Sequence, residues 1–357
     1  MLSSGIDGGG VGKIIYTYVK YIDRTRFNVD VASLNSENGN VPFYYEDFKK
    51  ICNNVYLLDK KNYFKRFGQW RSILKSKKYD IVHVHLEEAS SLYLLLALIY
   101  KVPVRIAHCH ITTIPDLFSF KGFKRLLLPL LYCVTTHKYS CGIEAGKRLW
   151  GKRDFVVMTN AIECEKFRFN QETRTLIREK LGIEDNVFVL GTVGRLHTQK
   201  NPFFIVDILG SLYKQNHKVQ LIWAGDGPMR SEIEDVISAK GLSDNVHLLG
   251  NRPDIGSLLM AMDVFILPSL YEGLPIVGVE AQASGIPCLF SDKITDEIRL
   301  SDNCIFLPIN NPHEWAIYIG KMKRHTDQRV DEKISSTIYN ISNAVKKLQN
   351  EYISYVV

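Results

Sequence analysis

The sequence lacks the patterns that mark disulfide-stabilised, zinc-binding or membrane-spanning proteins. Its seven cysteines are scattered with no Cys-x-x-Cys pair, which argues against a disulfide framework or a zinc site and favours reduced thiols in a cytosolic protein. The longest apolar run, residues 89–100, contains two serines and is too short to span a bilayer. We also expect no cleavable signal peptide, so the sequence predicts a cytoplasmic protein.

Two glycine-rich nucleotide-binding motifs are incomplete. A P-loop ends in Gly-Lys-Ser/Thr, but Gly12-Lys13 is followed by Ile14. A dinucleotide fingerprint needs Gly-x-Gly-x-x-Gly, and Lys13 stands in place of its last glycine. What remains is a glycine turn before a helix, where Gly9 and Gly10 let the backbone approach a ligand closely. A tight strand–helix turn without a ligand is the alternative.

Metal-binding motifs are weak as well. No Asp-x-Asp triplet occurs, so a metal-bridged diphosphate is not indicated. Two His-x-His pairs, His83/His85 and His108/His110, end predicted strands and can suggest a metal, but no carboxylate or cysteine cluster completes a site. We therefore expect no metal and no other cofactor. Ligands bind beyond the carboxyl ends of the strands in open parallel sheets, so His85, His108 and His110 are well placed to contact one.

The length and the order of the predicted elements indicate two domains. A chain of 357 residues is too long for one ordinary core, and strands alternate with helices throughout. This alternation predicts an α/β fold with two doubly wound, Rossmann-like domains facing a cleft. We place the first domain at residues 1–165, the second at 166–335 and a final helical segment at 336–357. Only residues 1–4 remain for the first strand, so we expect the true start of the chain to lie upstream.

The net charge of +7 is concentrated in the first half. Residues 1–170 hold 26 Lys and Arg against 15 Asp and Glu, a net charge of +11, whereas residues 171–357 hold 19 against 23, a net charge of −4. The asymmetry suggests an anionic lipid surface, a phosphorylated acceptor or nucleic acid as partner, and without a nucleic-acid motif we favour a membrane surface. Two apolar segments with basic flanks, 60–78 and 123–133, are the candidates for this contact. The alternatives are a core-facing stripe and a buried helix kinked at Pro129.

The stretch from Pro268 to Pro287 is the most informative part of the chain. The apolar run Val264–Leu267 before it predicts a buried parallel strand. Residues 274–284 predict a helix with Pro275 in its first turn and a stop at Gly285. A strand, a short turn and a helix start present backbone N–H groups and the positive end of a helix dipole at a sheet edge, which together form an anion site.

Two carboxylates bracket this anion site. Glu272 lies in the turn, and Glu280 lies roughly 7 Å further along the helix axis. A sugar nucleotide carries a sugar and a ribose on either side of its diphosphate, so one such ligand can reach both carboxylates. The alternative is that Glu272 caps the helix and Glu280 lies on its solvated face.

A second group of residues favours the same anion. Gly194, Arg195 and Lys200 follow the predicted strand 188–193 and precede a helix. Arg195 and Lys200 can supply fixed positive charge that stabilises a diphosphate leaving group as the sugar–oxygen bond breaks. Taken alone, these two residues are equally well explained as surface charges.

These motifs resemble those of a known enzyme family. They are Gly194-Arg195 with Lys200-Asn201, Gly225-Asp226-Gly227-Pro228, and Pro268-Ser269-x-x-Glu272-Gly273-Leu274-Pro275 with Glu280-Ala281. Together they are similar to the donor domain of the retaining glycosyltransferase family 4, which has the two-domain GT-B fold. The resemblance is specific over residues 190–290 and looser before residue 160, where the segments 79–85 and 105–110 are similar to bacterial members that assemble capsular polysaccharide and exopolysaccharide.

The resemblance implies roles for individual residues. Glu280 would hold the ribose hydroxyls, Glu272 the donor sugar, and His110 would lie near the reacting centre, with His108 as the alternative. The residues implied in donor binding are Gly9, Gly10, Gly194, Arg195, Lys200, Gly225, Arg252, Ile255, Glu272, Gly273, Leu274, Pro275 and Glu280. Those implied in catalysis are His110, Glu272, Arg195 and Lys200, and the acceptor-side candidates are His85, His108 and His110. The final helical segment would pack back on the first domain.

The function implied is that of a hexosyl- or N-acetylhexosaminyl-transferase in polysaccharide biosynthesis. It would move a sugar with retention from a nucleotide-diphospho-sugar, with UDP favoured by family usage, to a hydroxyl of a growing lipid-linked glycan at the inner face of the cell membrane. Two alternatives remain open from the sequence. One is a nucleotide-sugar epimerase, which would turn over the donor alone, and the other is a non-catalytic subunit of a polysaccharide assembly complex.

Overall fold

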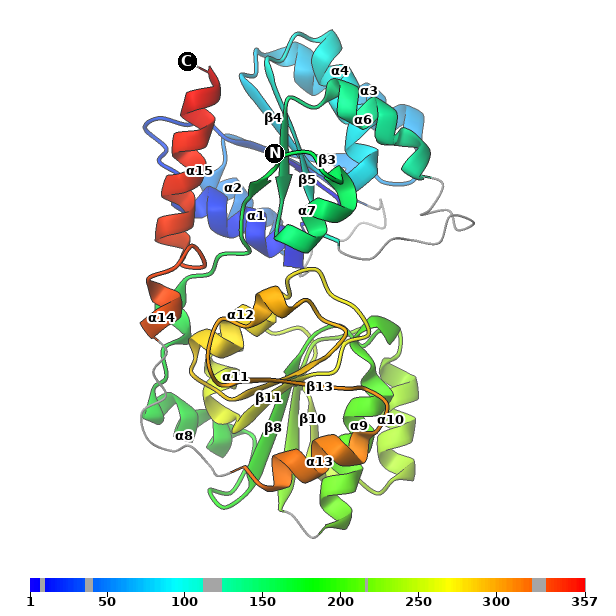
Figure 1. The fold of residues 1–357 in the computed structure, drawn as a ribbon, viewed down its shortest axis with the longest axis vertical. Coiled ribbons are helices and arrows are strands. Elements are labelled where there is room, and N and C mark those ends of the chain that lie inside the picture. Colours follow the sequence, from blue (N-terminus) through cyan, green and yellow to red (C-terminus); the bar gives the residue numbers. More distant parts are fainter. Residues whose placement is uncertain (7–9, 36–40, 112–123, 216–217, 323–331, 357) are drawn as a thin grey trace. The chain divides into compact units, whose positions relative to one another are not determined.

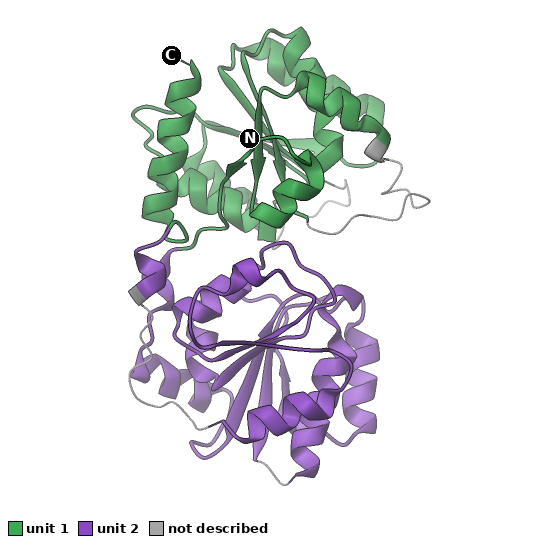
Figure 2. Cartoon of the chain, viewed as in Figure 1, with its two compact units in different colours: residues 1–162, 338–357 green, residues 163–337 purple. Residues whose placement is uncertain are grey.

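The chain folds into two compact units. The structure, a computed structural model, describes residues 1–6, 10–35, 41–111, 124–215, 218–322 and 332–356 (Figure 1). The first unit comprises residues 1–162 and 338–357, and the second comprises residues 163–337 (Figure 2). Within the described ranges, no helix combines the length and the apolar composition needed to cross a lipid bilayer.

The first unit is built on a parallel sheet with the strand order β3-β2-β1-β4-β5-β6-β7. Its strands are β1 Leu2–Ser3, β2 Asp30–Asn35, β3 Asn54–Asp59, β4 Ile81–His85, β5 Val104–Cys109, β6 His137–Ser140 and β7 Val156–Val157. Its helices are α1 Gly10–Tyr21, α2 Tyr45–Ile51, α3 Tyr63–Ser76, α4 Ser90–Ile99, α6 Leu128–Val134, α7 Ile143–Trp150 and α15 Ile341–Val356, with the 3₁₀ helices η1 Glu87–Ala89 and η2 Lys124–Leu127.

The second unit repeats this design with the strand order β10-β9-β8-β11-β12-β13. Its strands are β8 Phe188–Val193, β9 Val219–Ala224, β10 Val246–Leu248, β11 Val264–Leu267, β12 Cys288–Ser291 and β13 Cys304–Leu307. Its helices are α8 Gln171–Lys180, α9 Pro202–Lys214, α10 Arg230–Ala239, α11 Ile255–Ala261, α12 Ile276–Ala283, α13 Pro312–Gly320 and α14 Glu332–Ser335, with the 3₁₀ helices η3 Cys164–Phe167, η4 Thr198–Lys200, η5 Ser243–Asn245 and η6 Asp296–Ile298.

Both sheets reverse their strand order next to their first strand. In the first unit, β4 returns to lie beside β1, and in the second unit β11 returns to lie beside β8. The two doubly wound parallel sheets confirm the predicted fold class. Because ligands of open α/β sheets bind beyond the carboxyl ends of the strands at such a switch point, the topology alone marks one candidate edge in each unit.

Helix α15 completes the first unit. It packs against α1, and its Gln349 Oε1 accepts a hydrogen bond from the Asp23 backbone N–H at 2.5 Å. Its Glu351 accepts a hydrogen bond from the Tyr139 hydroxyl at 2.6 Å. The sequence placed this final segment at 336–357 and the first domain boundary at residue 165, whereas the units observed here divide after Ile162 and before Ile338.

A buried ion cluster fixes β11 beside β8 in the second unit. Asp263, directly before β11, is 2% exposed. Its carboxylate pairs with Arg174 at 2.6 Å and with Arg178 at 3.4 Å, both from α8, and accepts the Val189 N–H at 2.8 Å. Charges this deeply buried are tolerated only when they are paired and hydrogen-bonded, so the cluster joins α8 to the switch point of the sheet.

Two predicted helices differ from the structure in how they use proline. Helix α12 begins at Ile276, and Pro275 precedes it in an extended conformation with ψ 112°, so Pro275 caps the helix and does not lie in its first turn. Pro129 does not kink a longer helix, because α6 begins at Leu128 and Pro129 lies in its first turn, where a missing N–H has no cost. Residues 112–123, which include the start of the predicted 123–133 helix, lie outside the described residues.

The apolar stripe of α3 mostly faces the core. Trp70, Ile73 and Leu74 are buried, which supports the interpretation as a core-facing stripe over that of an interfacial helix. Phe64 is the exception, since its side chain is 94% exposed near the start of the helix.

Candidate functional site

The switch point of the second unit brings together the predicted anion-binding residues. Arg195 and Lys200 follow β8, and Glu272 follows β11, the neighbouring strand in the sheet. The four residues of β11 are completely or almost completely buried, as expected for an apolar strand covered on both faces. The two loops therefore leave the sheet side by side at its carboxyl edge.

Lys200 and Glu272 form a direct ion pair across this edge. The Lys200 Nζ lies 2.5 Å from Glu272 Oε1, and the side chains are only 17% and 10% exposed. Gln199 reinforces the contact, because its Nε2 donates to Glu272 Oε2 at 3.3 Å and to the Tyr271 carbonyl at 3.0 Å. The Gln199 carbonyl in turn accepts the Leu270 N–H at 2.9 Å. The pair is thus held rigidly where the two loops meet.

Arg195 and Arg252, the other two cationic residues predicted to bind the donor, differ in their ion pairs. Arg195 is exposed and forms no ion pair with any residue that the structure describes, so its guanidinium is available to an anion. Arg252 is engaged by Asp254, with contacts of 2.8 and 2.6 Å, and this pairing raises the pKa of Arg252. Ile255, the first residue of α11, is largely buried.

Glu280 lies inside the second unit. It is the fifth residue of α12 and its side chain is 0% exposed, so the alternative of a solvated helix face is wrong. Leu274 and Pro275 are buried, whereas Gly273 and Glu272 are partly exposed. The chain therefore passes from an accessible turn at Glu272 into a buried helix that carries the second carboxylate.

The glycines of this edge serve close backbone contacts. A Cβ at Gly225, which has φ 141°, would lie 2.0 Å from the Gly194 carbonyl oxygen, and a Cβ at Gly194 would lie 2.8 Å from Lys200 Cε. Gly194 thus leaves room for the Lys200 side chain, and Gly225 for the loop after β8. These contacts give each glycine a packing role that does not depend on a ligand.

The switch point of the first unit carries the histidines. Residue Ser3 of β1 pairs with His85 of β4, and α1 begins at Gly10. Gly9 lies outside the described residues, so its predicted role is not placed. His108 belongs to β5 and is completely buried, whereas His110 directly follows β5 and is partly exposed.

The side chains of His83, His85, His108 and His110 form one histidine stack. The rings of His83 and His85 stack at 4.3 Å, and those of His108 and His110 at 4.2 Å. Hydrogen bonds also join the histidines in pairs across the two strands. His83 Nε2 and His108 Nδ1 are 3.1 Å apart, and His85 Nδ1 and His110 Nε2 are 2.9 Å apart. The hydroxyl of Tyr352 in α15 contacts His83 Nδ1 at 2.5 Å.

Burial keeps the histidine stack neutral. Desolvation lowers the pKa of His110 to about 3 and holds the pKa values of His83, His85 and His108 well below their usual value. The mutual repulsion that a second positive charge would create acts in the same direction for His83, His85 and His108. His110 is therefore a neutral imidazole that can accept or donate one hydrogen bond but carries no charge at physiological pH.

The geometry of the histidine stack disfavours a metal centre. One nitrogen from each of His83, His85 and His108 lies within 4.8 Å of the others, so the set has the composition of a metal site. A metal ion lies in the plane of each imidazole that binds it, however, and the planes of His83 and His85 are stacked only 16° from parallel. Their lone pairs run alongside each other instead of converging, and His83 Nε2 is already bonded to His108.

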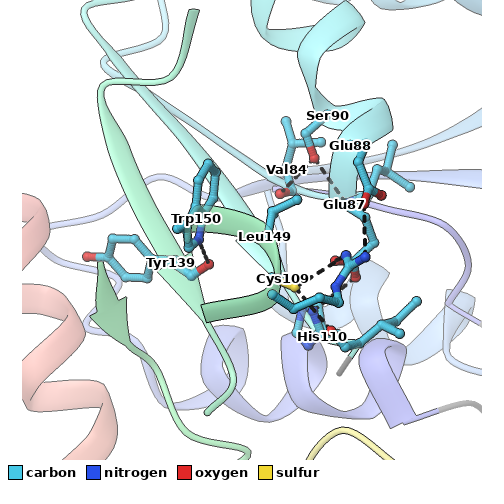
Figure 3. A network of polar contacts seen from close by, with 12 residues as sticks. Val84, Glu87, Glu88, Ser90, Cys109, His110, Tyr139, Leu149 and Trp150 are labelled. Carbon is cyan, nitrogen blue, oxygen red and sulfur yellow. Dashed lines mark hydrogen bonds and ion pairs between the residues drawn. The ribbon is translucent and has the colours of Figure 1, made fainter. Parts of the chain in front are cut away.

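A polar cluster that the sequence analysis did not find lies beside His110. Figure 3 shows Glu87, Glu88 and Cys109 around it. Arg148 of α7 donates hydrogen bonds to all three of these side chains. Glu87 Oε1 accepts the His110 backbone N–H at 2.9 Å. Burial raises the pKa of Glu87 above its usual value. The adjacent acidic pair Glu87-Glu88, which follows the predicted strand 79–85 after one intervening residue, was the signal that could have indicated it.

Comparison with known families assigns each half of the chain. Residues 8–136 match the model of "Glycosyltransferase Family 4", and residues 173–332 match that of "Glycosyl transferases group 1". Two doubly wound domains of these kinds define the GT-B glycosyltransferases. The chain belongs to this family, as an enzyme with a family 4 domain followed by a group 1 domain.

Individual relatives support the same assignment over the whole length. The protein named glycosyltransferase EpsF in Bacillus subtilis (strain 168) is 28% identical, with 98% of this chain and 94% of that protein covered. The Escherichia coli enzyme "UDP-Gal:alpha-D-GlcNAc-diphosphoundecaprenol alpha-1,3-galactosyltransferase" is 27% identical with the same coverage. Among solved structures, HepE from Anabaena in complex with UDP and glucose superposes with a TM-score of 0.82 at 20% identity, covering 99% of this chain and 98% of HepE, which shows the shared GT-B fold.

Proposed function

We propose that this glycosyltransferase moves a sugar from a UDP-sugar to a hydroxyl of a lipid-linked glycan, with retention of the anomeric configuration. The transfer takes place in polysaccharide biosynthesis at the inner face of the cell membrane. The observation that carries the proposal is the cationic and acidic set of Arg195, Lys200, Glu272 and Glu280 around the switch point of the second unit.

The charges of this set fit a diphosphate flanked by two sugars. Arg195 and Lys200 supply two cations to the diphosphate, and the negative charge that grows there as the sugar–oxygen bond breaks is stabilised by them. The Lys200–Glu272 ion pair orients the lysine before the donor arrives, so little reorganisation accompanies the reaction. In this proposal Glu280, which lies one turn into α12, binds the ribose hydroxyls.

The activities for which two relatives are named or solved support the choice of donor and acceptor. The Escherichia coli relative is named for a UDP-sugar donor and an acceptor sugar attached to diphosphoundecaprenol. HepE has been solved with UDP and with UDP-glucose. Carried over to this chain, these names favour UDP over other nucleotides and a polyprenyl-diphosphate-linked glycan as acceptor.

The proposed chemistry needs no metal and no protein nucleophile. The acceptor hydroxyl attacks the anomeric carbon on the face from which the diphosphate departs, and its proton passes to the departing phosphate oxygen. His110, whose Nε2 is held by His85 and whose burial keeps it neutral, is the residue that the family resemblance assigns to the reacting centre. Its neutrality matters, because a positive charge there would oppose the positive charge that develops on the sugar ring.

Donor binding is tested first by thermal shift. UDP, GDP and ADP at about 100 times their dissociation constants would stabilise a binding protein by about 2.7 kcal/mol, which for a unit of this size corresponds to roughly 5–10 °C. We expect UDP to produce this shift in the wild type and in a Glu179→Ala control, which changes an exposed residue of α8, and not in Glu280→Ala. A stabilisation by GDP or ADP alone, or one that survives in Glu280→Ala, contradicts the assignment.

Transfer itself is tested by product analysis. NMR of the glycan formed from a UDP-sugar and a short polyprenyl-diphosphate-linked acceptor reports the anomeric configuration. A retained configuration supports the mechanism, and clean inversion refutes it. Turnover of the donor alone to an isomerised sugar nucleotide would indicate an epimerase instead.

Membrane association is part of the proposal. The first half of the chain carries a net charge of +11, and its exposed apolar side chains include Phe64 of α3, Ile99 of α4 and Leu126 of η2. Helix α4 contacts both α3 and α6, and α6 contacts η2, so the elements that carry these side chains are neighbours in the first unit. Exposed apolar side chains among lysines are typical of a surface that docks on anionic lipid.

A further inference from the structure

Glu87 adopts a backbone conformation that its residue type disfavours. It follows β4 by two residues and has φ 53°, in the left-handed region. Glycine adopts this conformation without steric cost, whereas a residue with a Cβ does so at a cost of roughly 1–2 kcal/mol. A glutamate at such a position indicates that its side chain does something that a glycine could not.

The side chain of Glu87 holds the backbone where β5 ends. Residues of β4 and β5 pair in parallel register only as far as Val84 and Ala107. Beyond that point, Glu87 Oε1 accepts the His110 N–H at 2.9 Å (Figure 3). The Glu87 carboxylate thus takes the place of the next backbone hydrogen bond between the two strands, and it does so at His110.

Arg148 fixes the carboxylate from the other side. Its Nη2 lies 3.3 Å from Glu87 Oε2, and its Nη1 lies 2.9 Å from Glu88 Oε1. The same Nη2 donates to Cys109 Sγ at 3.6 Å, directly before His110. The side chains of Arg148, Glu87 and Glu88 are only 6%, 15% and 7% exposed, so the contacts are largely shielded from water.

We propose that Glu87 is a positioning residue for glycosyl transfer, which sets the place of His110 at the edge of the first unit, with Arg148 holding the carboxylate in place. The inference rests on the role of His110 in the proposed function. A displacement of about 1 Å between the groups that take part in a reaction lowers turnover by about 100-fold, which is the size of effect expected here.

The Glu87→Gly variant tests the proposal without imposing strain. Glycine accepts φ 53° freely, so the variant keeps the fold while it removes the carboxylate. We expect kcat to fall between about 10- and 100-fold while the donor KM and the UDP-induced thermal shift stay unchanged. Glu87→Gln, which keeps an oxygen for the His110 N–H, should recover most of the loss. Glu144→Gln on α7, an exposed glutamate paired with Lys147, is the matched control and should behave as the wild type.

A double-mutant cycle with His110→Ala decides whether Glu87 acts through the imidazole. If it does, Glu87→Gly has no further effect on kcat in the His110→Ala background. An equal loss in both backgrounds, or no loss in either, overturns the inference and leaves the proposed function intact. If His110→Ala alone leaves kcat unchanged, the role of His110 and the inference both fail, whereas donor binding remains tested separately by Glu280→Ala.

Discussion

The histidine stack predicts that the first unit loses stability in mild acid. Four imidazoles are neutral in the folded protein, because burial lowers the pKa of each of them. In the unfolded chain the same groups titrate near pH 6.5. Between pH 6.5 and about pH 3 the unfolded state therefore binds more protons than the folded state, and the free energy of unfolding must fall as the pH is lowered.

The size of this effect follows from the number of protons. Each histidine contributes about 1.4 kcal/mol for every pH unit over which it is protonated only in the unfolded state. The four histidines of the stack would lower the free energy of unfolding by about 5 kcal/mol between pH 6 and pH 5. Glu87, whose pKa is raised, opposes this by one proton at most. Since domains are stable by about 5–15 kcal/mol, the first unit should approach unfolding near pH 5.

Urea titrations from pH 5.0 to 7.5 measure the slope for each unit. Trp70 and Trp150 lie in the first unit, so a Trp223→Phe/Trp315→Phe variant isolates its fluorescence. We expect a steep pH dependence there. In His83→Gln the slope should be smaller by about 1.4 kcal/mol per pH unit, even though the variant is less stable at pH 7.5. A slope unchanged by this substitution, or a first unit equally stable at pH 5 and 6.5, would refute the reasoning.

Three further outcomes test other features. Gly225→Ala should lower the free energy of unfolding by well over 2 kcal/mol, because its Cβ would overlap the Gly194 carbonyl, whereas Gly241→Ala, at φ 67° in open space, should cost only about 1 kcal/mol in urea titrations. Asp263→Asn should cost about 3–5 kcal/mol, since it leaves two buried arginines without their carboxylate, and a loss below 1 kcal/mol would show that the cluster is not coupled. Phe64→Ser should leave stability within about 0.5 kcal/mol yet reduce flotation with anionic liposomes, and binding that is insensitive to both this change and salt contradicts the membrane proposal.

Much of the fold could be predicted from local sequence patterns. The predicted strand Val264–Leu267 agrees with the structure at both ends, because it is an apolar run bounded by Asp263 and Pro268. The predicted strand 188–193 agrees at both ends as well. The start of α12 was missed because the fixed φ of Pro275 suits both a first helical turn and an extended cap. Only ψ separates these two conformations, and the sequence does not encode it locally.

The candidate site was partly predictable for a related reason. Glu272 and Lys200 are far apart in sequence, yet both follow strands that the parallel topology places next to each other, so their proximity could be anticipated. The contact from the Glu87 carboxylate to the His110 N–H could not be anticipated. A glycine in the left-handed position would have predicted a turn, whereas a glutamate gives no such signal. The ion pair with Arg148 depends on how α7 packs on the sheet, which the local sequence does not specify.

The return of α15 to the first unit has a consequence for how the protein is made. Tyr352, which contacts the histidine stack, is synthesised after all 175 residues of the second unit. At translation rates of about 5–20 residues per second, the sheet of the first unit waits roughly 10–35 s on the ribosome before α15 can cover it. The second unit, which is continuous in sequence, can fold during that time, so the domain that begins first is the one completed last.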